Sequence, residues 1–350
     1  MQAGKLTNAQ IRANKRQMKR ELDAKRPFQA RVFTDFGAKV FMFTLLVGVS
    51  FAIMYPILAL MPMAFTDLRI LGDPNSIWIP ANFSLNSFEF VYRWVMRSPI
   101  SALSDYMIMV NSLFYALTIA FIQVFMSAMA GYALARTKFR GHNIVFFLVI
   151  LVFLVPRQSL LITQYLNFKQ FNPFGLMNLF AGGPLDLIDK PITLYLLAIF
   201  GFSVNQSLFI FILRQMFLGM PEEIEEAAYI DGAGFYRTYF KIMLPNAAPA
   251  ILTVAMLAFV WAYGDIYYTT YFNPHGPYFG KIIDMTFKDA NNWYINVAAR
   301  NWFGASNTND LAFEALKQAS ILMFLAPLLV IYFMVQKRIV ENLDRVGIIG

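Results

Sequence analysis

Few side chains in this chain of 350 residues could carry out catalysis or bind a metal. It contains no Cys and only two His, His142 and His275. The lack of Cys excludes a disulfide scaffold, a thiol nucleophile and a Cys-based zinc or iron–sulfur site. The two His residues lie far apart in predicted loops, without the spacing of metal ligands. We therefore expect no catalytic residue and no metal site. A membrane-embedded enzyme would need clustered acids, histidines or a metal, and the sequence has no such cluster.

The most informative group of polar residues lies in one segment, residues 221–249, which reads PEEIEEAAYIDGAGFYRTYFKIMLPNAAP. Pro221 suits the first turn of a helix, and the Glu residues after it favour the positive end of the helix dipole. Gly232 and Gly234 can both adopt the positive φ that ends a helix. Four residues recur at helical spacing and predict one shallow face that another segment can approach closely: Ile224, Ala227, Ala228 and Asp231.

A second short helix is expected to follow this turn, from about Phe235 until Pro245 stops it. Four of its residues are expected on one side: Tyr236, Tyr239, Phe240 and Met243. The segment thus predicts a helix-turn-helix lying under a membrane. Considered alone, the run EEIEEAA is more typical of a solvated helix end with acids that complement the helix dipole.

The composition places this segment in a membrane protein. Hydrophobic residues make up 58% of the chain and charged residues 14%, against roughly 25% charged in ordinary globular proteins. Five charge-free intervals approach or exceed the roughly 20 residues of a spanning helix: 40–66, 106–135, 191–213, 242–264 and 318–336. A sixth apolar run, 143–156, ends just before Arg157. We therefore predict an all-α membrane protein with a six-helix transmembrane domain over residues 36–340.

The distribution of positive charge predicts the orientation of this domain. Most of the 29 Lys and Arg residues fall in the first 39 residues, in the loop after the second span, around the 221–245 loop and in the tail. Positive charge marks the cytoplasmic side. We expect residues 1–35 to form a basic cytoplasmic segment held on anionic lipid, and residues 341–350 a cytoplasmic tail. The start of the chain lacks the pattern of a cleaved signal peptide. The long loop 272–317 is expected on the opposite side.

The spacing of the acidic segment resembles a known family. Glu226-Ala227-Ala228, three residues, Gly232, nine residues and then Ile242-Met243-Leu244-Pro245 match without a gap the EAA loop of ATP-binding-cassette (ABC) importer permeases. Further segments are similar to the sugar-type, maltose-permease-like permeases of that family: Asn111-Ser112, Tyr132 to Arg136, Lys138-Phe139, Gly141, Trp78-Ile79-Pro80, Ile230 to Ala233 and the tail QKRIVENLDRVGIIG. The chain is identified as a member of the type I, binding-protein-dependent group, over about residues 32–350.

This resemblance implies a function and a set of partners. The chain would be a permease subunit of an importer in a bacterial or archaeal cytoplasmic membrane, with carbohydrate as its solute. A second permease subunit, two cytoplasmic ATPases and an external solute-binding protein would complete the transporter. The implied ATPase-coupling residues are Glu226, Ala227, Ala228, Asp231, Gly232, Ile242, Leu244 and Pro245. The chain has no phosphate-binding G-x-x-x-x-G-K-[ST] motif, so ATP and magnesium would be bound by the partner ATPases, with no cofactor in this chain.

Other polar residues offer candidates for the solute path. Trp261 and Asp265 lie at the outer end of the fifth span, where they either line the path or anchor an aromatic belt at the interface. Sugar-type permeases often carry a Trp–Asn–Asp run at this place, from which the present spacing departs. Arg157 either faces a polar pathway or extends to the headgroups, and we favour the second. Polar residues inside the spans are expected to hydrogen-bond neighbouring helices: Asn111, Gln123, Asn205 and Gln206.

A secondary transporter or channel that is not powered by ATP is the main alternative. Such a protein would need ion-coupling acids or a filter within its spans, and Asp265 is the only acid at that depth. The sequence also lacks the internal repeats of many one-chain carriers. The aromatic residues of the 272–317 loop could stack on a sugar, contact the binding protein or pack the loop on its own domain.

Overall fold

The computed structural model describes residues 14–15, 28–67, 82–96, 105–288, 293–303 and 310–348. Within these ranges the chain is helical, and its only β pairing consists of two isolated bridges, Thr66 with Phe83 and Phe171 with Leu185. The chain divides into two units, Met1–Leu60 and Met61–Gly350. The Trp78-Ile79-Pro80 segment, most of the basic segment 1–35 and parts of the 272–317 loop lie outside the described residues.

The first unit contains one long helix, α2 (Phe28–Leu58), with Pro56 inside it. From residue 36 onward most of its side chains are exposed and apolar. This helix is therefore built for an apolar environment.

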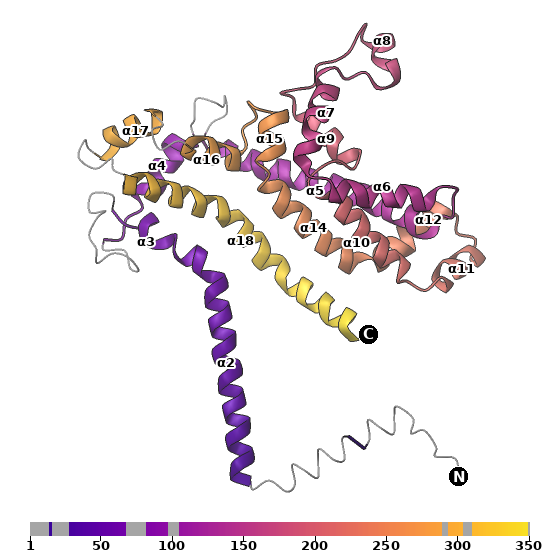
Figure 1. The fold of residues 1–350 in the computed structure, drawn as a ribbon, viewed down its shortest axis with the longest axis horizontal. Coiled ribbons are helices and arrows are strands. Elements are labelled where there is room, and N and C mark those ends of the chain that lie inside the picture. The colour runs from indigo at the N-terminus through magenta and orange to yellow at the C-terminus, as the bar shows by residue number, and fades with distance from the viewer. Residues whose placement is uncertain are drawn as a thin grey trace. The chain divides into compact units, whose positions relative to one another are not determined.

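The second unit contains the remaining helices (Figure 1). In chain order they are α3 (Met61–Ala64), α4 (Asn86–Phe90), η3 (Val91–Val95), α5 (Asp105–Arg136), α6 (His142–Leu154), α7 (Arg157–Lys169), η4 (Pro173–Gly175), α8 (Leu176–Phe180), α9 (Pro191–Ile199), α10 (Gln206–Leu218), α11 (Glu223–Ile230), α12 (Phe235–Thr238), η5 (Tyr239–Met243), α13 (Leu244–Asn246), α14 (Ala248–Tyr263), α15 (Tyr267–Phe272), α16 (Phe279–Phe287), α17 (Trp293–Phe303) and α18 (Asp310–Ile348).

The long helix α5 is the centre of this unit and packs against α9, α10 and α14. Small residues on α5 allow the close approach. A Cβ on Gly131 would lie 2.9 Å from the backbone nitrogen of Arg214 in α10, so only glycine permits this spacing. Buried residues of α5 and its neighbours, such as Ala116, Leu213 and Ala258, form one apolar core.

A second apolar core joins α3, α4, η3, α16 and α17 to the first half of α18. It lies at the end of the unit opposite α11 and α12 (Figure 1). Hydrogen bonds tie the turn after α15 to α5: Asn111 Nδ2 donates to Pro277 O at 2.9 Å, and the N–H of Phe279 donates to Ser112 Oγ at 2.8 Å. The Asn-Ser pair singled out in the sequence therefore holds the 272–317 loop against the central helix.

The predicted class, an all-α membrane protein, is confirmed, but several predicted spans are interrupted. Among the described residues, three helical stretches are long and apolar enough to cross a membrane: Phe36–Ala64, Met107–Arg136 and Leu311–Lys337. Two bent pairs of helices raise this number to five. One pair, α6 and α7, bends by 106° and the other, Phe235–Asn246 with α14, by 77°.

The predicted continuous spans 191–213 and 242–264 are wrong in detail. The first is broken between α9 and α10, where Asn205 has a positive φ of 52°. The second begins at Ala248, because residues 242–246 belong to the preceding helical segment. Both breaks fall within charge-free sequence, so hydropathy alone does not reveal them.

Candidate functional site

The EAA segment forms a short helix that ends in a tight turn. α11 runs from Glu223 to Ile230 with acidic residues in its first turn. Gly232 has a φ of +77°. Its N–H donates to Tyr229 O at 3.0 Å, and the N–H of Ala233 donates to Ala228 O at 2.9 Å. This pair of bonds is a Schellman motif, which satisfies the last carbonyl groups of the helix. Gly234 has a φ of −78°, so the prediction of positive φ is confirmed for Gly232 and wrong for Gly234.

The two alanines of the motif point to different environments. Ala228 is 3% exposed, on the side of α11 that packs against α12 and η5. Ala227 is exposed, as are Glu226, Ile230 and Asp231. The expected common face of Ala227, Ala228 and their helical neighbours is therefore divided. Ala228 permits close packing inside the chain, whereas Ala227 and Ile230 leave a shallow apolar surface beside Glu226.

Arg136, the last residue of α5, joins this helix to the membrane domain. Its Nη2 donates to the carbonyl oxygens of Phe217 at 2.8 Å and Met220 at 2.5 Å, at the end of α10. On its other side, Nε lies 3.5 Å from Oε1 of Glu225, and both side chains are largely buried. Nη1 lies 3.7 Å from the exposed Glu222. One guanidinium group thus neutralises the free carbonyls of a helix C-terminus and holds the first turn of α11.

Aromatic packing reinforces the same junction. The ring of Tyr132, one turn before Arg136, lies 5.3 Å from Phe217, 5.5 Å from Phe235 and 4.9 Å from Tyr239 between centroids. These partners belong to α10, α12 and η5. Tyr132 therefore contacts α10 and the second helix of the helix-turn-helix, and a displacement of that helix would act on the end of α5.

The I-x-L-P part of the motif forms the second arm. Residues 235–246 are helical, with a π-helical turn at Tyr239–Met243. Pro245 lies within this helical segment and is exposed, and the bend follows at Ala247, so the prediction that Pro245 stops the helix is wrong. Asn246 Nδ2 donates to Ile242 O at 2.9 Å. Ile242 and Leu244 are half-buried. The arm meets α14 at the 77° bend.

The expected single side of this second arm is also divided. Tyr239 and Met243 are buried, whereas Tyr236 and Phe240 are exposed. The extra residue of the π-helical turn breaks the regular 3.6-residue spacing on which the expectation rested.

Sequence reasoning missed Tyr132, Arg136 and Glu225 as parts of this site. In the sequence, Arg136 contributed only to the positive charge of the cytoplasmic loops, and Tyr132 only to the similarity to sugar-type permeases. Glu225 differs from its acidic neighbours only in its place on α11, which turns its carboxylate towards Arg136. An available signal was the arginine directly after a long charge-free interval, since an arginine at a helix end can bond free carbonyl groups.

The two candidates for the solute path lie near each other on the chain but make separate contacts. The ring of Trp261 in α14 stacks on Phe209 in α10, with centroids 5.5 Å apart. Asp265 Oδ1 accepts the N–H of Tyr268 at 3.1 Å, as an N-terminal cap does. Both residues are half-buried, and their proposed contact with solute stays a prediction.

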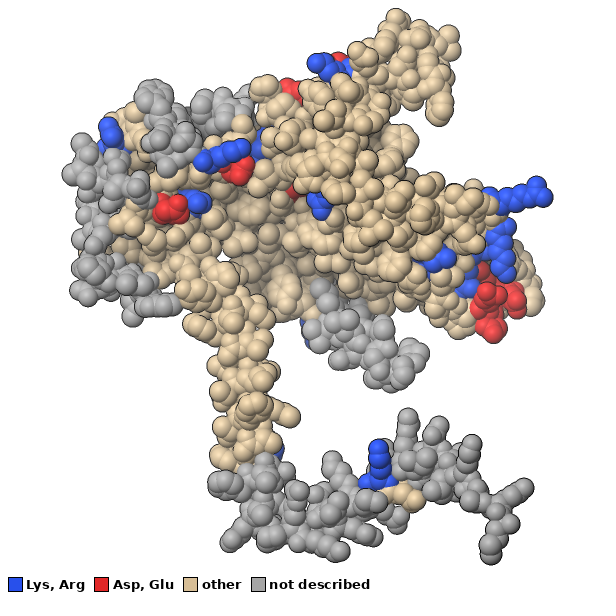
Figure 2. Space-filling view, in the orientation of Figure 1, with Lys and Arg blue, Asp and Glu red and all other residues tan. Residues whose placement is uncertain are grey.

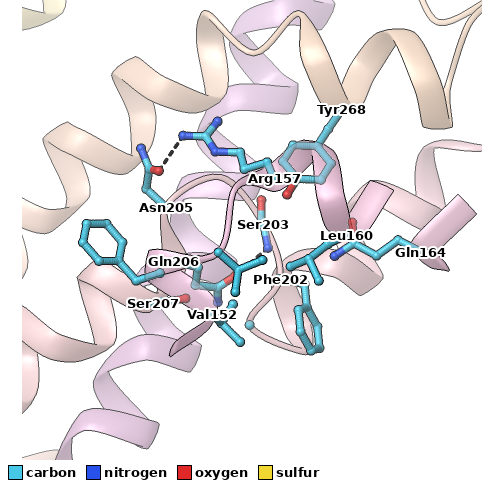
Figure 3. A pocket seen from close by; sticks show the side chains of 13 residues that line it. Val152, Arg157, Leu160, Gln164, Phe202, Ser203, Asn205, Gln206, Ser207 and Tyr268 are labelled. Atoms are coloured by element: carbon cyan, nitrogen blue, oxygen red, sulfur yellow. Dashed lines mark hydrogen bonds between the residues drawn. The ribbon is translucent and has the colours of Figure 1, made fainter. Parts of the chain in front are cut away.

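Arg157 lines a small pocket between α6, α7, α15 and the break between α9 and α10 (Figure 3). Its guanidinium group donates to Asn205 Oδ1 in the break between α9 and α10. The preferred interpretation, extension to the headgroups, stays a prediction. Gln206 Nε2 donates to Ala198 O at 2.6 Å and Gln123 Nε2 to Val204 O at 3.2 Å. The expectation that polar residues of the spans bond neighbouring elements is confirmed for Asn111, Gln123 and Gln206.

The two histidines lie in separate places. His142 Nε2 is 2.5 Å from Leu134 O, and His275 Nδ1 is 2.8 Å from Asp189 Oδ2. Across the described ranges, no three His, Cys, Asp or Glu side chains gather as metal ligands. Partial burial raises the pKa of Asp189, but hydrogen bonds from His275 outweigh this effect and lower it overall. The hydrogen bonds between Asp189 and His275 join the loop before α9 to the turn after α15.

Residues 123–345 match the family of binding-protein-dependent transport system inner membrane components. This match covers more than half of the chain, so the chain belongs to that family. It is a membrane permease component rather than an enzyme.

Individual relatives support this membership. The chain is 28% identical to the arabinooligosaccharides transport system permease protein AraQ of Halalkalibacterium halodurans, over 60% of this chain and 66% of that protein. It is 25% identical to the maltodextrin transport system permease protein MalD of Streptococcus pneumoniae, over 86% of this chain and 92% of that protein. It spans only 51% of a probable ABC transporter permease protein of Pyrococcus horikoshii.

A solved structure has the same fold. A chain of a bacterial ABC transporter involved in the import of the acidic polysaccharide alginate superimposes with a TM-score of 0.61. The match covers 89% of this chain and 98% of that chain, at 20% sequence identity. The predicted fold of an ABC importer membrane domain is therefore confirmed, but the predicted number of six spans is not.

Proposed function

We propose that this chain is a permease subunit of an ATP-driven importer of carbohydrate. A second permease subunit, two ATPase subunits with their ATP and magnesium, and an external solute-binding protein would complete the complex. The proposal is supported by the family and by relatives whose names refer to maltodextrin, trehalose and arabinooligosaccharides. The observation that carries it is the structure of the EAA loop, which presents one face outwards and is anchored to α5 and α10 by the other.

The exposed face of α11 is the contact for the ATPase in this proposal. Ala227 and Ile230 offer a shallow apolar surface, and Glu226 adds a charge at its edge. Nucleotide-driven movement of the ATPases would displace α11 as a unit, because the Schellman turn at Gly232 fixes it to the second arm. The displacement would reach α10 through Arg136 and α14 through the bend at Ala247. The spans would then alternate between inward-facing and outward-facing arrangements.

The orientation follows from the same assignment. The end of the domain that carries α11 faces the cytoplasm, and both termini lie on that side. The opposite end, with α4, α16 and α17, would receive the binding protein. Trp261 and Asp265 are proposed to lie along the solute path between these ends.

The test uses the assembled transporter and one change on each arm of the loop. Ala227→Trp places a large ring on the exposed face of α11, and Tyr236→Trp changes an exposed residue of α12 as the matched control. We expect Ala227→Trp to abolish co-purification of the ATPase and ATP-dependent sugar uptake into proteoliposomes. The control should retain both. Full ATPase binding and uptake by Ala227→Trp would overturn the proposed coupling, and uptake by the permease subunits without any ATPase would favour a secondary carrier.

A further inference from the structure

A small apolar lobe projects from the membrane domain between α7 and α9. It comprises residues 171–185 and includes η4 and α8 (Figure 1). Its two ends are joined by a β bridge, in which the Phe171 N–H donates to Leu185 O at 2.9 Å and the Leu185 N–H donates to Phe171 O at 3.0 Å. The lobe is therefore a closed excursion of the chain and not an open loop.

Internal contacts fix the shape of the lobe. Asn172 Oδ1 accepts the N–H of Met177 at 3.0 Å, and Asn172 Nδ2 donates to Asn178 Oδ1 at 3.0 Å. Phe174 has a φ of 53°, a conformation rare for a bulky residue and kept only where the surroundings impose it. At the base, the ring of Phe171 stacks on Phe168 at 5.8 Å between centroids. The lobe is thus preformed, with the backbone of Phe174 in the left-handed region.

The surface of the lobe is apolar and uncharged. Phe174 is fully exposed, and Leu179 and Phe180 are 78% and 77% exposed. No charged residue occurs from 170 to 185, while Lys169 and Asp186 flank this interval. Figure 2 shows the lobe without charge, with charged groups only at its base. A surface of this kind would promote aggregation in water, and it marks a contact with a membrane or with another protein.

The geometry of α6 and α7 limits the depth of the lobe. α6 has 13 residues and rises about 20 Å, less than the roughly 30 Å thickness of the hydrocarbon core. None of its residues is buried within the chain. Because α7 bends by 106° from α6, it makes no further advance along the direction of α6. With α6 along the membrane normal, the lobe lies level with the membrane rather than above it.

The exposed side of α7 agrees with a position along the membrane surface. Ile162 and Leu166, four residues apart, are exposed apolar side chains beside the exposed polar Thr163 and Asn167. Such a division into apolar and polar halves is typical of helices that lie in the interfacial plane.

We propose that the lobe 171–185 is a membrane anchor, with Phe174, Leu179 and Phe180 inserted among lipid chains of the leaflet on the α7 side. Its composition favours lipid over a protein partner. Protein interfaces surround their apolar core with a polar rim, whereas the only polar side chains of residues 171–185 are Asn172 and Asn178, which bond each other. Its Phe, Leu and Met side chains, with no polar group at the tip, match the acyl-chain boundary instead.

The anchor would fix the lateral end of α7 while the bundle moves. Phe168 at the end of α7 packs edge-on against Phe272 of α15, with centroids 5.8 Å apart. The lobe is therefore attached to the bundle through α7, whose other end, at Arg157, is bonded to the break between α9 and α10. This role is independent of the solute and of the ATPase.

The test uses the natural absence of cysteine. Single cysteines at Phe174 and Leu179 carry a nitroxide spin label in the assembled transporter, reconstituted in phosphatidylcholine–phosphatidylglycerol nanodiscs. Collision with oxygen, which concentrates in lipid, is compared with collision with the water-soluble chelate nickel ethylenediamine diacetate. Phe147→Cys on the exposed surface of α6 is the lipid reference, and Asp186→Cys at the base of the lobe is the matched polar control.

We expect the ratio of oxygen to nickel collisions at Phe174→Cys and Leu179→Cys to approach that of Phe147→Cys and to exceed that of Asp186→Cys several-fold. A ratio as low as that of Asp186→Cys would place the lobe in water and overturn the proposal. Low collision rates with both reagents, together with an immobilised spectrum, would show a protein contact and overturn it equally.

Discussion

Two glycines of the EAA loop provide a matched test of the Schellman turn. A Cβ at either Gly232 or Gly234 would meet no atom within 4 Å, so neither position is limited by space. They differ in conformation, with φ of +77° at Gly232 and −78° at Gly234. Valine at both positions therefore isolates the effect of the backbone.

The energetic cost of valine at position 232 follows from this difference in φ. A non-glycine residue held at positive φ costs about 1–3 kcal/mol, and a β-branched residue lies towards the upper end because its side chain crowds the backbone. An energy of about 2 kcal/mol corresponds to roughly 30-fold in the population of the intact turn. Gly234→Val should change that population little, since valine accepts the extended conformation. The population of the intact turn in Gly232→Asn should lie between those of Gly232→Val and Gly234→Val, because Asn tolerates the left-handed region.

The turn is measured directly by hydrogen exchange of the peptide that contains Gly232 and Ala233, whose N–H groups donate the two closing bonds. Gly232→Val should accelerate this exchange and reduce sugar uptake per ATP hydrolysed by the assembled transporter. Gly234→Val should leave both unchanged. Equal behaviour of the two valine variants would refute the role assigned to the positive φ, and unchanged coupling in both would remove Gly232 from the coupling mechanism.

Three further predictions concern other parts of the membrane domain. Arg136→Met leaves the largely buried Glu225 without its positive partner, so we expect the free energy of unfolding to fall by about 3 kcal/mol. The thermal midpoint in detergent should fall accordingly, and adding Glu225→Gln should partly restore it. Gly131→Leu should lower the thermal midpoint and the yield of folded protein because its Cβ meets the backbone of α10, whereas Gly48→Leu in α2, with no atom within 4 Å, should not. Burial lowers the pKa of Lys281 from 10.5 to about 8. Between these pH values the unfolded chain binds more protons than the folded chain, so the thermal midpoint should rise with pH. Lys281→Met should flatten this rise, and an unchanged slope would contradict the effect of burial.

Sequence reasoning located the helical membrane domain because hydropathy records the absence of charge. It placed α5 to within one residue at each end. Of α18 it located only the middle, since this helix runs from Asp310 to Ile348, beyond the predicted span 318–336 at both ends. It also located α11 and its terminal turn, because the preferences of Pro221, the acidic first turn and Gly232 are local. Local preference could not separate Gly232 from Gly234, whose conformations depend on how the second arm packs.

Side-chain direction in the coupling loop was beyond the reach of the sequence. Helical spacing grouped Ala227 with Ala228, but the choice of the buried residue depends on α12 and η5. Arg136 and Glu225 lie 89 positions apart in the sequence, and nothing in either neighbourhood records their pairing. The π-helical turn at Tyr239–Met243 likewise shifts the register of the second arm by one residue.

The interrupted helices show why charge-free intervals are not always continuous spans. Backbone groups released at membrane depth must find partners inside the protein. At the break between α9 and α10, Gln206 and Gln123 bond the carbonyl groups of Ala198 and Val204. The break is therefore stabilised by two uncharged side chains, one of them from α5, which a scan for charge passes over.

These contacts give α10 a particular place between the two ends of the domain. Its C-terminal end is held by Arg136 through the carbonyl groups of Phe217 and Met220. Its N-terminal end begins at the break, and Phe209 near that end stacks on Trp261. α10 is one helix of 13 residues, so a displacement at its C-terminus is transmitted along its length rather than absorbed. α10 is therefore the element through which movement of α11 would reach the residues expected to line the solute path.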